Sequence, residues 1–436
     1  MSAASAAEER FLPAKSTNQP QPVFCPPART GILVRMTSIS RRQWHTVWKR
    51  LLVCLPACIA LLLAGCRHRG FPHYPSDFRE YAWVTDGGSN SVTVLDLINM
   101  VSAKTIPVGS DPVAVAVNPK KNEVYVANSG SGTISVIDAV TNRVAATIRV
   151  HRQPVSIDVN ADGTRAYVVN AGSNNVSVLD LTARRQIATF GVGESPAMAR
   201  ISPDGNTLVV TNRGGNSVSI VDAHSLVVRA VFTGCSQASQ PVILPDSSKA
   251  FVACSGGHRV MAIGLARPKS ELAEEHRDRL LDFLDVGPQP IHLALKPDGG
   301  EIFVSNYGSD TISEIATNNN EVGWSYMIGQ HPWGGVVSAD NSTLWVSNSG
   351  DNTVAAYSID DGQRVNTVQV GDGPGPLALS SDGFLLLTVD TLSGDISVLR
   401  TLTYTPRGQP VLGSLFTVLA AGRNPNAIAV KGFRVP

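Results

Sequence analysis

Residues 123–160 read EVYVANSGSGTISVIDAVTNRVAATIRVHRQPVSIDVN, and this stretch decides the fold expected for the whole chain. It holds four short segments rich in Val, Ile and Thr, at 123–128, 133–139, 143–150 and 154–160. Gly, Asn and Pro separate them, a pattern that favours strands joined by turns over helix. The connections are only a few residues long. We therefore expect antiparallel strands, because parallel strands need crossovers of a dozen residues or more.

The same unit recurs along most of the chain. The last residues of the second strands in successive repeats are Asp86, Asn128, Asn170, Asn212, Cys254, Asn306, Asn348 and Asp390. Successive members of this series are 42 residues apart, except for one interval of 52. Four strands with their turns need about 40 residues, which is the length of a β-propeller blade. The repeat predicts an all-β fold, a single β-propeller over 81–436.

The number of blades follows from the expected innermost strands. These begin at Pro112, Pro154, Pro196, Ala238, Pro290, Pro332, Pro374 and Pro425. The direct count is eight four-stranded blades, and seven is the alternative if one terminal unit stays outside the ring. The last strand, in 424–430, is expected to pair with the first three, in 81–108. Such a closure ties the C-terminal strand to the N-terminal strands and leaves no free sheet edge.

The strand motifs YVAN, YVVN, VVTN, FVSN and WVSN are followed by segments such as TISVID and later by VG-x-x-P. This pattern resembles the YVTN-type β-propeller repeat over roughly 81–430. The resemblance implies the propeller fold. It implies no single activity, because related propellers include cell-surface modules and partners of redox enzymes.

The first part of the chain has the features of an export signal. Residues 51–65, LLVCLPACIALLLAG, are uncharged and follow Arg41, Arg42, Lys49 and Arg50. A basic segment before a short apolar run is typical of a secretory signal peptide. The run ends in Leu63-Ala64-Gly65-Cys66, which resembles a bacterial lipobox and implies a lipid on Cys66. A short buried helix or a retained membrane anchor is the alternative.

These features divide the chain into four parts. Residues 1–35 are expected to be a disordered extension or to precede the true start, which is Met1 or Met36. Residues 36–65 form the lipoprotein signal peptide, 66–80 a tether and 81–436 the propeller. The resemblance implies an exported, lipid-anchored protein at the outer membrane, facing the periplasm or the cell surface, and Cys66 then makes the membrane its first partner.

Charge is unevenly distributed between the leader and the body. The chain has 36 basic and 35 acidic residues, but residues 1–65 hold eight of the basic and two of the acidic ones. The remainder therefore carries 28 basic and 33 acidic residues, a formal net charge of −5. Affinity for nucleic acid comes largely from Lys and Arg that neutralise phosphates. The body is thus not expected to bind nucleic acid.

Two cysteines remain in the body. Cys235 stands in the loop before an innermost strand, where other units have Gly, and Cys254 ends the second strand of the same blade. Both positions lie on one face of the ring, and an oxidising compartment favours disulfides. The sequence predicts a Cys235–Cys254 disulfide.

Two units carry insertions, at 266–284 and 401–414. Both fall between a third and a fourth strand, and therefore on the face of the ring opposite to the loops that precede the innermost strands. They are either contacts for a partner or tolerated excursions of the chain.

A propeller usually binds ligands where the loops before innermost strands meet those after second strands. The candidate residues of this ligand face are Asp86, Asp111, Arg152, Arg213, Tyr307, His331, Trp333, Asp390 and Arg423. Asp86 and Asp390 are either an acidic pair or plain substitutions for Asn in a turn. His331 and Trp333 could stack a ligand, although Trp333 could equally fill space between blades.

Motifs for catalysis, haem attachment or phosphate binding are absent from the sequence, and no His residues stand at metal-ligand spacing. The favoured interpretation is a monomeric, non-catalytic binding or scaffold module without a cofactor, for a protein, glycan or small ligand. The alternative is an enzyme, a propeller hydrolase of the sugar-lactonase type. That alternative requires one divalent metal held by carboxylates from several blades.

Overall fold

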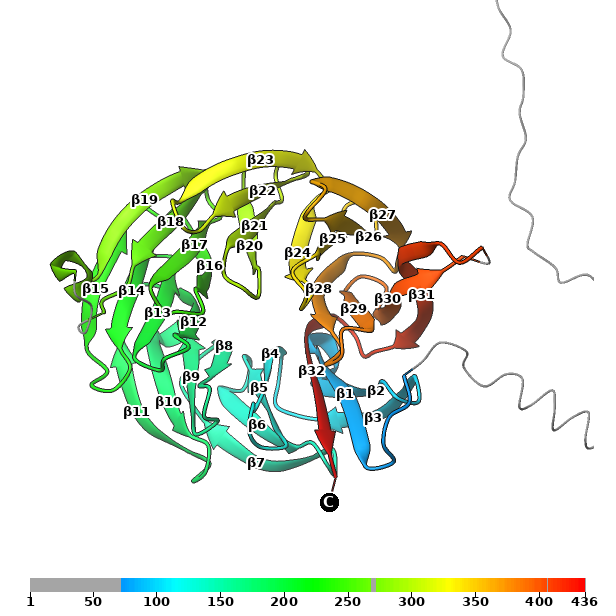
Figure 1. Cartoon of the computed structure of the whole chain (residues 1–436). Helices are drawn as coiled ribbons and strands as arrows, with labels where there is room; N and C mark the ends of the chain where they lie inside the picture. Colours follow the sequence, from blue (N-terminus) through cyan, green and yellow to red (C-terminus); the bar gives the residue numbers. More distant parts are fainter. Residues whose placement is uncertain (1–71, 268–271, 406, 436) are drawn as a thin grey trace, which may run out of the picture. The chain divides into compact units, whose positions relative to one another are not determined.

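The computed structural model describes residues 72–267, 272–405 and 407–435; Cys66 and the leader lie outside them. Within the described residues, four-stranded antiparallel sheets follow one another around a ring, eight in all (Figure 1). This confirms the eight-bladed all-β propeller and excludes the seven-bladed alternative. We call the loops that precede inner strands and follow second strands the top face, and the opposite loops the bottom face.

The inner strands line the centre of the ring. They are β4 (Pro112–Val117), β8 (Pro154–Val159), β12 (Pro196–Ile201), β16 (Ala238–Ile243), β20 (Pro290–Leu295), β24 (Pro332–Val337), β28 (Pro374–Leu379) and β32 (Pro425–Arg434). The second strands are β1 (Phe78–Asp86), β5 (Glu123–Asn128), β9 (Arg165–Asn170), β13 (Thr207–Asn212), β17 (Lys249–Cys254), β21 (Glu301–Asn306), β25 (Thr343–Asn348) and β29 (Leu385–Asp390).

The third strands and the outer strands complete the blades. The third strands are β2 (Ser91–Asp96), β6 (Thr133–Asp138), β10 (Asn175–Asp180), β14 (Ser217–Asp222), β18 (Arg259–Gly264), β22 (Thr311–Ala316), β26 (Thr353–Ser358) and β30 (Asp395–Tyr404). The outer strands are β3 (Val101–Pro107), β7 (Arg143–Arg149), β11 (Arg185–Gly191), β15 (Val228–Thr233), β19 (Arg279–Asp285), β23 (Glu321–Met327), β27 (Gln363–Gln369) and β31 (Pro410–Ala420).

The core lies between neighbouring blades, where the second and third strands are almost completely buried. Large side chains such as Trp83, Tyr125, Phe251 and Trp345 fill these spaces and are at most 1% exposed. Burying one large apolar side chain contributes about 1.5–3 kcal/mol. A single sheet has no partner for these faces, so each blade depends on its two neighbours.

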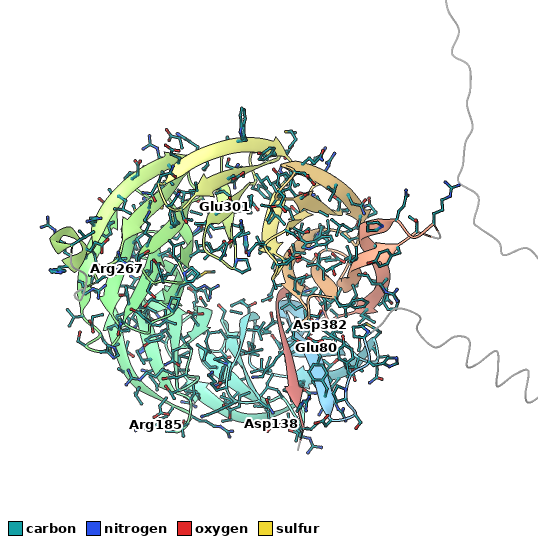
Figure 2. The ribbon with its side chains drawn as sticks, viewed as in Figure 1. Glu80, Asp138, Arg185, Arg267, Glu301 and Asp382 are labelled. Carbon is teal, nitrogen blue, oxygen red and sulfur yellow. A yellow bond between two sulfur atoms is a disulfide. The ribbon has the colours of Figure 1, made fainter. Side chains whose placement is uncertain are left out.

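The ring is closed by the last strand. Strand β32 pairs antiparallel with β1, and Trp83 lies opposite Ala429 in this pairing. The sheet order β3-β2-β1-β32 is the predicted shared blade. Glu80 on β1 also reaches the preceding blade, where its Oε1 accepts a hydrogen bond from the Ser381 backbone N at 2.6 Å, beside Asp382 (Figure 2). Burial raises the pKa of Glu80, and hydrogen bonds to Ser381 partly oppose that rise.

One hydrogen bond recurs between neighbouring blades on the top face, and we call it the clamp. The residue before each third strand is often Asn in the left-handed conformation, such as Asn90, Asn174 and Asn216. Its Oδ1 accepts a hydrogen bond from the backbone N of the residue before the next inner strand; Asn174 binds Ser195 in this way at 2.8 Å. The clamp residues are Asn90, Asn174, Asn216, Asp310 and Asn352. Each clamp joins the top loop of one blade to the inner strand of the next.

A second recurring feature pairs the last residue of the second strand with a glycine. Asn212 ends β13 and donates from Nδ2 to Ser217 Oγ at 3.1 Å and to Ser219 Oγ at 2.9 Å. A Cβ added to Gly193 would lie 2.5 Å from Asn212 Cγ. Glycine is therefore required there because the loop before the inner strand passes directly over the Asn side chain.

The insertions lie on the bottom face, between a third and an outer strand, as predicted. The first includes the short 3-10 helix η3 (Ala273–His276), and the second lengthens β30 and β31 into a hairpin that projects from the rim (Figure 1). Two further 3-10 turns, η1 (Gly87–Ser89) and η2 (Ala171–Ser173), follow second strands. No helix in 72–267, 272–405 or 407–435 has the length and apolar character needed to cross a membrane.

Candidate functional site

The inner strands enclose a cavity of about 590 Å³ in the central channel. Much of its wall is apolar, with side chains such as Val113, Val155 and Ile291. Its polar and aromatic members come from several blades: Ser156, Arg200, Arg213, Ser239, Gln240, Ser255, His292, Trp333 and Asn426. Among the described residues that line the cavity there is no carboxylate. The channel is therefore the place where cationic and aromatic groups converge.

Trp333 is the second residue of β24, and 39% of it is exposed. The corresponding residue of the next inner strand is Gly375, where an added Cβ would lie 4.0 Å from Trp333 Cδ2. The indole thus packs beside a position without a side chain while part of its surface stays accessible. The contact with the next blade agrees with a space-filling role for Trp333, and its stacking of a ligand stays a prediction.

Two arginines line the cavity, one from a top-face loop and one from an inner strand. Arg213, on the top loop after β13, has no ion pair or hydrogen bond from its side chain to the described residues. Arg200, on β12, forms an ion pair from Nη1 to Asp158 Oδ1 at 3.0 Å. Asp158 Oδ2 also accepts a hydrogen bond from the Ile201 backbone N at 2.9 Å. Arg200 is thus held in place, whereas the charge of Arg213 is not neutralised by a partner.

His292 on β20 is half-buried, and it borders the cavity. Its Nδ1 accepts a hydrogen bond from the Gly335 backbone N of the next blade at 3.2 Å. Burial, with a smaller contribution from the charge of Arg200, lowers the pKa of His292 to about 4. At neutral pH the ring is therefore uncharged and carries its proton on Nε2, as a hydrogen-bond donor.

Polar side chains of the inner strands are also bonded across blade boundaries. Gln240 Oε1 accepts from the Leu293 backbone N at 2.7 Å. Asn426 Nδ2 donates to the Pro112 carbonyl at 3.0 Å, and Thr85 Oγ1 donates to Asn426 Oδ1 at 2.5 Å. The bonds of Gln240 and Asn426 to backbone groups each join two neighbouring blades, and the Thr85–Asn426 bond lies within the closing blade; together they fix the positions of groups that surround the cavity.

Tyr307 and His331 lie together on the top face but not in the cavity wall. Their rings stack with centroids 4.6 Å apart and an interplanar angle of 16°. The Asp310 carboxylate accepts a hydrogen bond from the His331 backbone N at 2.8 Å. His331 therefore stacks on Tyr307, and of the two predicted stacking residues only Trp333 borders the cavity.

The remaining exposed candidates occupy different parts of the top face. Arg152 lines a groove between two blades, and Arg423 lines another. Asp111 is exposed beside the first of these grooves. A Cβ added to Gly130, which lines that groove, would lie 3.3 Å from the Cβ of Asp111. Of the predicted ligand-face residues, only Arg213 and Trp333 border the central cavity.

Asp86 and Asp390 are completely buried, which corrects their assignment to the ligand face. Asp86 accepts hydrogen bonds from Thr93 Oγ1 at 2.8 Å and from the Gly422 backbone N at 2.9 Å. Asp390 accepts one from Ser397 Oγ at 2.6 Å. Each carboxylate is hydrogen-bonded to the third strand of its own blade, and each stands at the position where most other blades have Asn. Asp86 and Asp390 are therefore substitutions for Asn at the end of the second strand, and they do not form an acidic pair on the ligand face.

Cys235 and Cys254 form a disulfide with a sequence separation of 19 residues. They occupy the two positions that Gly193 and Asn212 occupy in the preceding blade. The contact between loop and strand that forces glycine elsewhere is thus replaced in this blade by a covalent bond.

Sequence reasoning missed Arg200, Gln240 and His292, because it sought ligand groups in loops. A signal was present, since these polar residues interrupt the inner strands MARI, SQPVI and IHLAL at positions where most blades have small or apolar residues; Asp158, the ion-pair partner of Arg200, is the exception at the position of Arg200. No group of three or more His, Cys, Asp or Glu side chains within the described ranges is arranged to hold a metal ion.

Comparisons with known proteins agree on the architecture. No family model and no curated protein matches the sequence. A solved structure of a protein of unknown function from Desulfotomaculum acetoxidans is 18% identical, with a TM-score of 0.53, over 80% of this chain and 98% of that one. Dihydro-heme d1 dehydrogenase NirN in complex with DHE is 13% identical, with a TM-score of 0.55, over 72% and 76%.

A candidate 6-phosphogluconolactonase from Bacteroides uniformis is 15% identical, with a TM-score of 0.54, and covers 82% of this chain and 100% of its own. At these identities the likeness is one of fold. The neighbours include both a protein solved with a bound group and a candidate hydrolase, and the fold itself is shared by many functions.

Proposed function

We propose that this protein is a non-catalytic binding module whose central channel takes a small organic anion with a flat, apolar part. One observation carries the proposal: Arg200, Arg213 and Trp333 border a single cavity whose described lining has no carboxylate. A cavity of about 590 Å³ is within the range of small-molecule sites, which combine an apolar wall with a few polar groups.

The chemistry of each group suits that ligand. An unpaired guanidinium such as Arg213 binds carboxylate, sulfonate or phosphate with two parallel hydrogen bonds. The neutral His292 donates one hydrogen bond without adding charge. The indole of Trp333 offers an aromatic face for a flat group. Arg200, on the inner strand β12, adds positive potential to the cavity, although its ion pair with Asp158 offsets part of that potential.

The proposal extends to the anchoring of the protein. We infer that the chain is an exported YVTN-type propeller, lipid-anchored through Cys66 at the outer membrane, where it faces the periplasm or the cell surface. The apolar run at 51–65, the Leu63–Cys66 sequence and the repeat pattern support this, and a disulfide in the body suits an oxidising compartment. Labelling with radioactive palmitate is expected to mark the wild-type protein and not Cys66→Ser; equal labelling of both would contradict the anchor.

The channel is tested with the full chain and anilinonaphthalene sulfonate, a flat fluorescent anion, and with benzoate as a competitor. Arg213→Gln is expected to weaken binding about tenfold or more, because a hydrogen bond to a charged group is worth about 1.5–3 kcal/mol. Trp333→Ala is expected to weaken it by a similar factor. Arg423→Gln, which removes an exposed top-face arginine outside the cavity, serves as the matched control and should stay within twofold.

Two results would overturn the proposal. One is an equal loss of binding in Arg213→Gln and Arg423→Gln, since the anion would then respond to general surface charge. The other is a stoichiometric divalent ion that stays with the purified protein after dialysis, which would favour the metal-dependent hydrolase instead.

A further inference from the structure

Three of the eight junctions on the top face lack the clamp described above. The residue before the third strand is His258 at one of them, and it is a glycine, Gly132 or Gly394, at the other two. Both glycines keep the left-handed backbone of the clamp residues, with φ of 65° and 77°. Each of these two glycine junctions carries a groove between neighbouring blades, lined by Gly132 in one case and by Gly394 in the other. At both junctions the position of the clamp side chain is thus part of the open groove.

The groove at Gly132, which we call the basic groove, has a volume of about 930 Å³, against about 470 Å³ for the groove at Gly394. The two differ in charge. The basic groove is lined by Arg149, His151 and Arg152, and the other, among its described lining residues, by Arg423 alone of the basic residues. No carboxylate is among the described residues that line the basic groove, and its hydroxyl groups come from Ser129, Ser131, Thr133 and Ser173.

A second departure from the repeat builds this groove. His151 stands where all the other blades except that of Cys235 have glycine, such as Gly109 and Gly193, beneath which the Asn side chain of the second strand lies. Its Nε2 lies 3.2 Å from Thr189 Oγ1 of β11, so the ring is held toward the outer strand of its own blade. Neither Arg149 nor Arg152 forms an ion pair with any described residue. Two guanidinium groups are thus available at the edge of a hydroxyl-rich groove.

We propose that the basic groove binds a saccharide that carries a sulfate or phosphate ester. The arginines fit a tetrahedral oxyanion, which they bind with paired hydrogen bonds. Seryl and threonyl hydroxyls match the hydroxyls of a sugar as both donors and acceptors. The volume is larger than an inorganic ion needs, and Val150 is the one apolar side chain among the described lining residues. The site differs from the central channel in position and in ligand.

The test uses calorimetric titration of the full chain with a sulfated heparin disaccharide, with glucose phosphate and with the neutral sugar cellobiose. The first two probes distinguish a sulfate from a phosphate ester. We expect binding of at least one ester and none of cellobiose. Gly132→Asn restores the clamp and places a side chain in the groove at the junction, so it should weaken that binding at least tenfold. Gly394→Asn makes the same change in the other groove and should stay within twofold.

A Cβ at residue 132 would lie 3.1 Å from the His151 carbonyl oxygen, so a second variant guards against a folding defect. Arg149→Gln combined with Arg152→Gln changes only exposed side chains and is expected to weaken binding at least tenfold as well. Arg213→Gln in the channel should leave it unchanged, which separates this site from the proposed function. The inference fails if neither ester binds, if cellobiose binds equally well, or if the double arginine variant binds like the wild type.

Discussion

The residue that ends each second strand shows how one position can hold either an amide or a carboxylate. Asn128 donates from Nδ2 to Ser135 Oγ at 3.0 Å, whereas Asp390 accepts from Ser397 Oγ at 2.6 Å. The serine hydroxyl can do both because it is donor and acceptor. The exchange therefore keeps the hydrogen bond but places a charge in the interior. Burial raises the pKa of Asp390 to about 7, and the nearby Asp395 carboxylate adds to the rise.

This pKa predicts how Asp390 affects stability. The unfolded chain releases the proton near the ordinary value of 3.8, whereas the folded protein keeps it up to about pH 7. The free energy of unfolding therefore falls as pH rises from about 4 to about 7, by at most about 1.4 kcal/mol per pH unit. Asp390→Asn removes this contribution. In urea unfolding, its stability relative to the wild type should increase by about 2–4 kcal/mol between pH 4 and pH 8.

The reverse substitution, Asn to Asp, tests the same position in another blade. Asn348→Asp places a buried carboxylate at the equivalent site of the neighbouring blade and should introduce a pH dependence of the same sign, but a smaller one, because Thr353 stands there in place of Asp395. Parallel pH profiles of the wild type and Asp390→Asn would contradict the assignment. From the sequence, Asp390 was recognisable as a replacement for Asn, but its raised pKa depends on burial and on Asp395, which only the folded blade brings together.

At the scale of elements, the hairpin of β30 and β31 departs most from its counterparts. The sequence predicts only an insertion at 401–414, whereas the structure continues both strands, to Tyr404 and from Pro410. Gly413 has φ of 75°, and a Cβ there would lie 2.9 Å from the buried ring of Trp345 in the preceding blade. Asn366 Nδ2 also donates to the Gly413 carbonyl at 2.9 Å. The bend at Gly413 thus brings the hairpin against the adjoining blade.

Gly413→Ala is expected to destabilise the protein by about 3 kcal/mol, because it combines the left-handed strain with overpacking against Trp345. Gly408→Ala is the control: its φ is 77°, but a Cβ there meets nothing within 4 Å. It should cost only about 1 kcal/mol. Thermal unfolding of both variants measures the difference, and equal losses would show that the contact with Trp345 contributes nothing.

At the scale of the whole molecule, stability depends on closure. The pairing of β32 with β1 covers one edge of the first sheet, and Phe433 packs with Tyr81 at a centroid distance of 6.0 Å. Without β32, the edge of β1 and the apolar residues around Trp83 would face solvent. An exposed edge strand is prone to pair with other chains.

Removal of residues 425–436 is therefore expected to lower the free energy of unfolding by at least about 5 kcal/mol and to produce soluble aggregates. Phe433→Ala removes packing but keeps the strand, so it should cost about 3 kcal/mol and leave a monomer. Size-exclusion chromatography with light scattering, followed by thermal unfolding, distinguishes the two. A truncated chain that stays monomeric and as stable as Phe433→Ala would show that closure is not required.

The sequence by itself determined the blades, their order and the way in which the ring closes. It could do so because these features depend on local patterns: the 42-residue period, the Pro at the start of inner strands and the Asn-Gly pairs of the turns. It also pointed to Cys235 and Cys254, since both replaced residues of the repeat. The two grooves, the burial of Asp390 and the convergence of Arg200, His292 and Trp333 were decided only by the tertiary structure. Residues of different blades, far apart along the chain, meet at the centre of the ring, and what they form depends on the space that the neighbouring blades leave.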